Sequence, residues 1–141
     1  MPDASTGQVH THALRVYYED TDAGGIVYYA NYLKFAERAR TEWLRRLGIE
    51  NGELMRDERI AFAVRECHAD YAKPARLDDA LEVRTRVEEI SGASLRMHQD
   101  ICRDGEVLVA VKVRLACMDI DTGQVRRLPN RVRDALAAGR T

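Results

Sequence analysis

Long apolar runs are absent from this 141-residue sequence. No stretch approaches the roughly 20 consecutive apolar residues that a membrane-spanning helix needs, so no transmembrane segment is predicted. The N-terminal residues MPDASTGQVHTHA have neither the basic segment nor the apolar segment of a secretory signal peptide. We therefore expect a cytoplasmic protein.

A strong excess of either charge is also missing. Although 32% of the residues are charged, the formal net charge is −1, which argues against binding nucleic acid or an anionic membrane through bulk electrostatics. Cysteine is scarce as well: Cys67, Cys102 and Cys117 are odd in number and widely spaced in apolar, strand-like segments. We expect reduced core cysteines rather than disulfides or metal ligands.

The sequence does contain enough apolar residues for a core, at 45% of the chain. Its length fits one domain, because domains commonly run to about 100–200 residues. We expect a single domain over residues 1–141, with residues 1–8 and 129–141 as peripheral tails. The sequence contains no internal repeat or low-complexity segment.

One stretch organises the chain, RVYYEDTDAGGIVYYANYLKFAERARTEWLRRLG, which begins at Arg15. Residues 14–19 alternate between apolar and polar, the pattern of a half-buried strand. An acidic, glycine-containing loop follows at residues 19–25. From about Asn31 the apolar residues recur at helical spacing, and Gly48 is a plausible C-terminal stop. A carboxylate-bearing loop therefore directly precedes a helix N-terminus.

Four strand-like segments follow, after a polar stretch with room for one short helical turn. They run from Ile60 to about Tyr71, from Leu81 to Glu88, from Leu95 to Ile101 and from Val107 to Leu115. The last is apolar on both sides, which predicts a central or interface strand, and Asp104-Gly105 is a hairpin signal before it. A short helix is expected around residues 132–137. The order β-α-β-β-β-β with short connections predicts an α+β fold with a mostly antiparallel sheet.

A single long helix covers little of such a sheet, so apolar surface should remain exposed. Association with further copies of the chain would bury that surface. We therefore expect a homodimer or homotetramer.

The residues resemble a known family. The stretch from Arg15 is similar to the signature of the 4-hydroxybenzoyl-CoA thioesterase family, and most similar to the acyl-CoA thioesterases associated with the Tol-Pal envelope system. A second segment, YAKPARLDD from Tyr71, matches that subfamily's Y-x-x-P-A-R-L-D-D pattern. The resemblance covers about residues 12–120. It implies the hotdog fold, in which a five-stranded, mostly antiparallel sheet wraps one long central helix. It also implies hydrolysis of a fatty or aromatic acyl-CoA to the acid and free CoA.

The resemblance also points to catalytic positions. The family's catalytic carboxylate is the second aspartate of its D-x-D-x-x-G motif, which corresponds to Asp22. Seven residues later the Tol-Pal subfamily often has histidine, whereas this chain has Tyr29, so no histidine function transfers. The family also uses the backbone N–H of that position, directed at the thioester carbonyl, and this function is compatible with tyrosine.

The chemistry of thioester hydrolysis fits these residues. Asp22 can act as a nucleophile that forms a mixed anhydride or as a base that activates water, and the sequence leaves both open. The helix N-terminus near Tyr29 can stabilise the oxyanion without a metal or cofactor. Gly24 and Gly25 allow the backbone close to the thioester.

Each of these residues also has a structural interpretation. Asp22 could simply form an Asx-turn, which is common for aspartate in loops. Asn31 is a candidate substrate contact but also a candidate helix N-cap, and the second is favoured. Tyr28 and Tyr29 could line an acyl pocket or lie in the core. We expect Asp20 to have a structural or secondary role.

Two other functions remain open. An enoyl-thioester hydratase needs an Asp–His dyad, and no histidine follows Asp22 in the loop or the helix. A non-catalytic module that binds acyl-CoA or acyl-carrier protein is disfavoured by the intact Asp22. Acyl-carrier protein is also a possible carrier for the hydrolase. Candidate partners for the CoA phosphates lie on the predicted strands: Arg84, Arg86, Arg96, Lys112 and Arg114.

Overall fold

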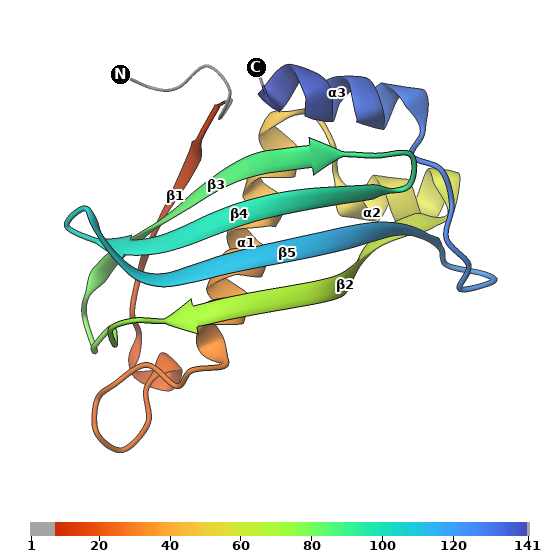
Figure 1. Cartoon of the computed structure of the whole chain (residues 1–141). Coiled ribbons are helices and arrows are strands. Elements are labelled where there is room, and N and C mark those ends of the chain that lie inside the picture. The colour runs from red at the N-terminus through yellow and green to blue at the C-terminus, as the bar shows by residue number, and fades with distance from the viewer. Residues whose placement is uncertain (1–7, 141) are drawn as a thin grey trace.

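The computed structural model describes residues 8–140. The strands are β1 (His10–Arg15), β2 (Ile60–Tyr71), β3 (Ala80–Ile90), β4 (Ser94–Arg103) and β5 (Glu106–Asp119) (Figure 1). The helices are the 3₁₀ turn η2 (Tyr18–Asp20), α1 (Asn31–Arg46), α2 (Asn51–Glu53), the π-helical turn η3 (Leu54–Glu58) and α3 (Asn130–Arg140). Among these helices, none has both the length and the apolar character needed to cross a bilayer.

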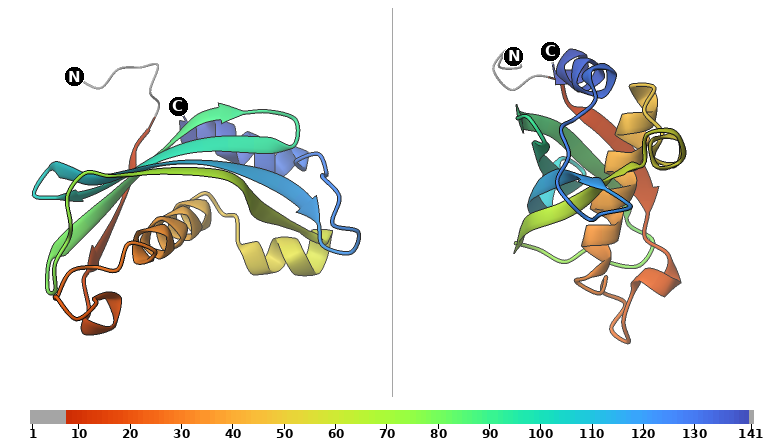
Figure 2. Two further views of the ribbon diagram at one scale, coloured as in Figure 1. Left: turned by 60° about the horizontal axis from the view of Figure 1, so that its bottom comes forward. Right: turned by 90° about the vertical axis from the view of Figure 1, so that its right-hand side faces the viewer.

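The five strands form one sheet in the order β1-β3-β4-β5-β2, and every neighbouring pair is antiparallel. The sheet curves around α1, which lies against its concave face (Figures 1 and 2). This is the expected hotdog arrangement, and the prediction of an α+β fold is confirmed. The strand that is apolar on both sides, β5, lies between β4 and β2, so the prediction of a central position is also confirmed.

Helix α1 forms because its apolar residues recur on one face. Those that are buried include Tyr32, Phe35, Ala39 and Trp43, at spacings of three or four residues, and they pack on the sheet. The predicted stop at Gly48 is confirmed: this residue has φ of 81°, and its N–H donates to the Arg45 carbonyl at 2.9 Å. The helix is thereby fixed at both its face and its C-terminal end.

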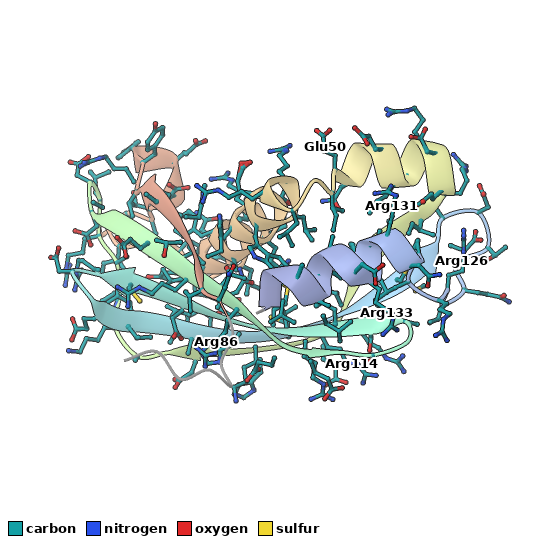
Figure 3. All side chains as sticks on the ribbon, turned by 90° about the horizontal axis from the view of Figure 1, so that it is seen from above. Glu50, Arg86, Arg114, Arg126, Arg131 and Arg133 are labelled. Carbon is teal, nitrogen blue, oxygen red and sulfur yellow. The ribbon has the colours of Figure 1, made fainter. Side chains whose placement is uncertain are left out.

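Helix α3 contributes to the core. Val132 and Leu136 are fully buried in the cluster that contains Trp43, so the expectation of a peripheral tail after residue 129 is corrected. The helix is also longer than expected. Arg131 lies between α3 and the turn η3, with its Nε 3.5 Å from a carboxylate oxygen of Glu58 (Figure 3). Residues 1–7 of the other expected tail lie outside the described part of the chain.

Two local expectations were wrong. Strand β1 ends at Arg15 instead of continuing through Tyr18, because the Tyr17 N–H donates to the Asp20 carboxylate at 2.9 Å and starts η2. Cys67 is exposed, because it lies on the edge strand β2, whereas Cys102 and Cys117 are buried as expected. All three cysteines are free thiols.

The opposite face of the sheet is polar. Cross-strand register places His68, Lys112, His98 and Arg86 at one level of four adjacent strands. Figure 3 shows Arg86 and Arg114 on this side, away from α1. The basic residues that could contact CoA phosphates therefore project from the face opposite the central helix.

The segment between β2 and β3 is held by Asp79. Its carboxylate accepts hydrogen bonds from the Arg76 N–H and from Arg103 Nη1, both at 2.8 Å. Burial alone would raise the pKa of the Asp79 carboxyl. The two hydrogen bonds together with the positive charges of Arg103 and Arg76 outweigh that effect and keep the pKa below its usual value. Asp79 therefore ties the segment to the end of β4.

We predict that Asp79→Asn lowers the free energy of unfolding by about 1–3 kcal/mol at neutral pH, because a charge-assisted pair is lost. A lowered folded-state pKa stabilises the fold above the unfolded-state pKa, and this contribution disappears as pH falls through the folded-state value. Urea unfolding at pH 7 and at pH 3 measures both effects. The difference between wild type and variant should shrink at the lower pH.

The matched control is Asp70→Asn, at an exposed position of β2. It should change stability little at either pH. An Asp79→Asn variant as stable as Asp70→Asn would contradict the anchoring function.

Candidate active site

The acidic loop between η2 and α1 folds back on itself as a small hairpin. Thr21 pairs with Val27, and the Asp22 N–H donates to the Ile26 carbonyl at 3.0 Å. The turn is closed by the Gly25 N–H, which donates to the Asp22 carbonyl at 3.1 Å. Gly25 has φ of 72°, a conformation that glycine adopts without strain. The loop thus has a defined backbone, below the N-terminal end of α1 in Figure 1.

Asp22 is exposed near the tip of this hairpin. Its Oδ1 accepts the Gly24 N–H at 3.0 Å, so the Asx-turn considered from the sequence is present. This hydrogen bond orients the carboxylate. Within residues 8–140 no hydrogen bond or ion pair engages Oδ2, which leaves one oxygen available to a ligand or water.

Asp20 has a structural role, as expected. Its carboxylate accepts the Tyr17 N–H, and its carbonyl accepts both the Tyr28 N–H at 3.0 Å and Asn31 Nδ2 at 2.9 Å. The N-cap prediction for Asn31 was wrong: Ala30 occupies the cap, and Asn31 is the first helical residue. Its side chain reaches back to the loop instead. The side chain of Asn31 thus fixes the loop to the helix.

The backbone just before the first turn of α1 provides a hydrogen-bond donor. The N–H groups of Asn31, Tyr32 and Leu33 donate to carbonyls three residues earlier, at 2.8, 3.3 and 3.2 Å. The Tyr29 N–H has no acceptor in the described part of the chain. It lies at the positive end of the helix dipole, where unpaired N–H groups favour an anion. This residue matches the donor expected from the family resemblance.

Tyrosine rings connect the loop to the end of the edge strand. Tyr29 contacts Tyr28, with ring centroids 4.9 Å apart, and meets Tyr71 edge-on at 6.0 Å. Tyr71 also contacts Tyr32, at 5.8 Å. The exposed fractions of Tyr28 and Tyr29 are 50% and 61%, so these two rings are not core residues. They form an accessible aromatic wall beside the loop.

A segment with no role assigned from the sequence supports the loop. The Val27 N–H donates to the Ala75 carbonyl at 2.9 Å, and the Leu77 N–H donates to the Gly25 carbonyl at 3.0 Å. The Ala75 N–H donates to Tyr32 Oη at 2.9 Å. Ala75 and Leu77 belong to the YAKPARLDD segment. Its match to the family pattern was the sequence feature from which a role for these residues could have been predicted. Their function was missed because it is exerted through backbone groups across a large sequence separation.

The loop carries few side chains that could ligate a metal. In residues 8–140, no group of three or more His, Cys, Asp or Glu side chains is placed to hold a metal ion. The polar groups at the loop are a carboxylate and backbone N–H donors. This set suits acid–base or nucleophilic chemistry at a carbonyl.

Comparison with known proteins identifies the family of the chain. Residues 16–136 match the model of the thioesterase-like superfamily. An acyl-CoA thioesterase YbgC from Haemophilus influenzae is 43% identical over 86% of this chain and 90% of its own length. An acyl-CoA thioester hydrolase YbgC from Escherichia coli is 45% identical over 84% and 89%.

A solved structure is similar over the same region. The probable thioesterase from Bartonella henselae has a TM-score of 0.82 and 38% identity, and the match covers 86% of this chain and all of that one. The family model covers well over half of the sequence, including the loop, α1 and strands β2 to β5. The chain therefore belongs to the thioesterase-like superfamily.

Proposed function

We propose that this protein hydrolyses an acyl-CoA to the free acid and CoA, with Asp22 as the catalytic carboxylate. One observation carries this proposal: an exposed carboxylate lies on a hydrogen-bonded loop that leads directly into a helix N-terminus with an unpaired N–H in the described residues. Similarity to relatives that are named acyl-CoA thioesterases supports the substrate class.

In the proposed reaction the thioester carbonyl oxygen accepts the Tyr29 N–H, which stabilises the negative charge that develops there. Asp22 either attacks the carbonyl carbon or removes a proton from the attacking water. In both routes the C–S bond breaks, and the CoA thiolate takes up a proton. When Asp22 is the nucleophile, a water molecule then hydrolyses the mixed anhydride, which releases the acid and regenerates the Asp22 carboxylate. Gly24 and Gly25 leave space for the thioester. Tyr28 lies beside the acyl group, and Asn31 positions the loop.

CoA is the favoured carrier because the related enzymes are named for it, and acyl-carrier protein is the alternative. The hydratase alternative is not favoured, because it needs a histidine beside the catalytic aspartate. His98 bonds to Asp100 at 2.7 Å, but both lie on β4 in the sheet and not at the Asp22 loop. A cytoplasmic location fits a substrate that carries CoA.

Assembly through the edge strand is part of the proposal. Strand β2 pairs only with β5, so along its outer side its backbone groups have no strand partner in the described residues. Its exposed apolar side chains include Val64, at 52%, and Tyr71, at 43%. An unprotected edge of 12 residues invites pairing with a second copy. We therefore propose a homodimer built on β2, which could pair further into a tetramer.

Substituting the proposed catalytic carboxylate is the first test. Asp22→Asn keeps the size of the side chain and should lower kcat by about 10²–10⁴-fold while acyl-CoA binding persists. Free-thiol release from short, long and aromatic acyl-CoAs, and from an acyl-carrier protein thioester, measures the effect and the preference. Glu19→Gln, at an exposed carboxylate of the same loop, is the control and should retain activity. Full activity in Asp22→Asn would show that another residue is the catalytic carboxylate. A wild-type protein that hydrolyses none of these thioesters would favour the non-catalytic binding module.

The backbone donor has its own test. Tyr29→Pro removes the N–H and should lower kcat by about 10²–10³-fold, whereas Tyr29→Ala retains it and should keep most of kcat. Thermal unfolding of both variants checks that the helix is intact. Equal losses of kcat in the two variants would assign the effect to the tyrosine ring instead.

The proposed interface predicts the outcome of an edge substitution. Val64→Lys should shift the protein toward the monomer in sedimentation velocity, because it would place a charged side chain on the pairing edge of each copy. Val107→Lys, at an exposed valine near the β4–β5 hairpin, should leave the assembly unchanged. A dimer that tolerates lysine at position 64 would place the interface on another surface.

A further inference from the structure

A second cavity lies along the central helix, apart from the Asp22 loop. It has a volume of about 320 Å³ and opens between α1, the α2–η3 segment and the first half of β2. Arg40 lines it, nine residues after the first residue of α1, which is about 14 Å along the helix axis. The cavity is therefore distinct from the proposed catalytic loop of the same chain.

The cavity has an apolar wall and one cation. The apolar wall consists of Leu44, Met55, Phe62, Val64 and Leu115. Glu37 lies at the rim, where its carboxylate accepts the Thr41 hydroxyl at 2.7 Å. Arg40 is the cationic residue of the lining, and burial lowers its pKa, opposed by the nearby Glu37 charge.

Arg40 is held by a neutral partner. Its Nη1 donates to Oε1 of the fully buried Gln99 at 2.9 Å. Gln99 is itself fixed, because its Nε2 donates to the Ala36 carbonyl at 2.8 Å and to Thr85 Oγ1 at 3.0 Å. No ion pair involves Arg40 in the described part of the chain. A rigidly mounted guanidinium thus keeps most of its donors for another acceptor.

We infer that this cavity binds an apolar monocarboxylate, with the carboxylate on Arg40 and the hydrocarbon chain against the apolar wall. A planar guanidinium fits a carboxylate in bidentate geometry, and burial strengthens such a pair. Octanoate is a suitable probe because it joins one carboxylate to one apolar chain.

The ligand belongs to the class of acid that the proposed hydrolysis releases, so the biological meaning of the site rests on the proposed function. Binding itself does not require turnover. The uncleaved thioester is neutral at its carbonyl, so a cation at this position distinguishes the product from the substrate. Val64 lines the cavity and also lies on the edge strand β2, so in the proposed dimer the second copy would lie beside the cavity.

The test is calorimetric titration of the full chain with octanoate and with 1-octanol at equal concentrations. Wild type should bind octanoate at least about tenfold more tightly than octanol, and Arg40→Gln should lose that preference. Arg38→Gln, at an exposed arginine on the same helix, is the matched control and should bind like wild type. Met55→Trp alters an exposed wall residue and should weaken binding of both ligands, which covers the case in which Arg40→Gln does not fold.

Asp22→Asn separates this inference from the proposed function. It should bind octanoate like wild type even though its turnover is lost. Octanoate binding without acyl-CoA hydrolysis by wild type would overturn the proposed function and retain the cavity. The assignment of the cavity would be overturned by equal affinity for octanoate and octanol, or by no octanoate binding. It would also be overturned if Asp22→Asn lost octanoate binding and Arg40→Gln did not.

Discussion

The packing of one helical face on one sheet determines where the chemistry can occur. The buried stripe of α1 leaves the helix little freedom to rotate or slide, because its residues interdigitate with β3, β4 and β5. The N-terminus of α1 is therefore held at one rim of the sheet, and its unpaired N–H has a fixed direction. The Asp22 loop is tied to this rim by Asn31 and to the segment before β3 by Ala75. Preorganised donors of this kind stabilise charge without reorganising during the reaction.

The elements that could be predicted from sequence are those with a strong local signal. The helical period of α1, the stop at Gly48 and the Asp104-Gly105 hairpin each depend on residues that are neighbours in the chain. The end of β1 was misplaced because the side chain of Asp20, three residues after Tyr17, competes for its backbone N–H. The exposure of Cys67 depends on strand order, which the alternation of β2 does not encode.

The candidate site divides in the same way. Asp22 and Tyr29 could be proposed from the motif, since they lie close in sequence and match a family pattern. The support of the loop by Ala75 could not, because its hydrogen bonds are made by backbone groups that any residue type carries. Arg40 was also missed, since an arginine one turn from Glu37 predicts only a solvated helix face. Its partner Gln99 is 59 residues away in the sequence and lies buried on β4.

The polar network around Arg40 needs a physical reason to exist. Gln99 and Thr85 are fully buried at the middle of the sheet, where apolar residues of similar size would pack without a desolvation penalty. Buried polar groups of this kind do not add stability relative to an apolar core. Their hydrogen bonds do fix the position of a guanidinium whose remaining donors face a cavity. The proposed ligand recognition at Arg40 would give this fixed geometry a function. Asp22 is comparable, because its Asx-turn orients a carboxylate whose other oxygen has no hydrogen-bond or ion-pair partner in residues 8–140.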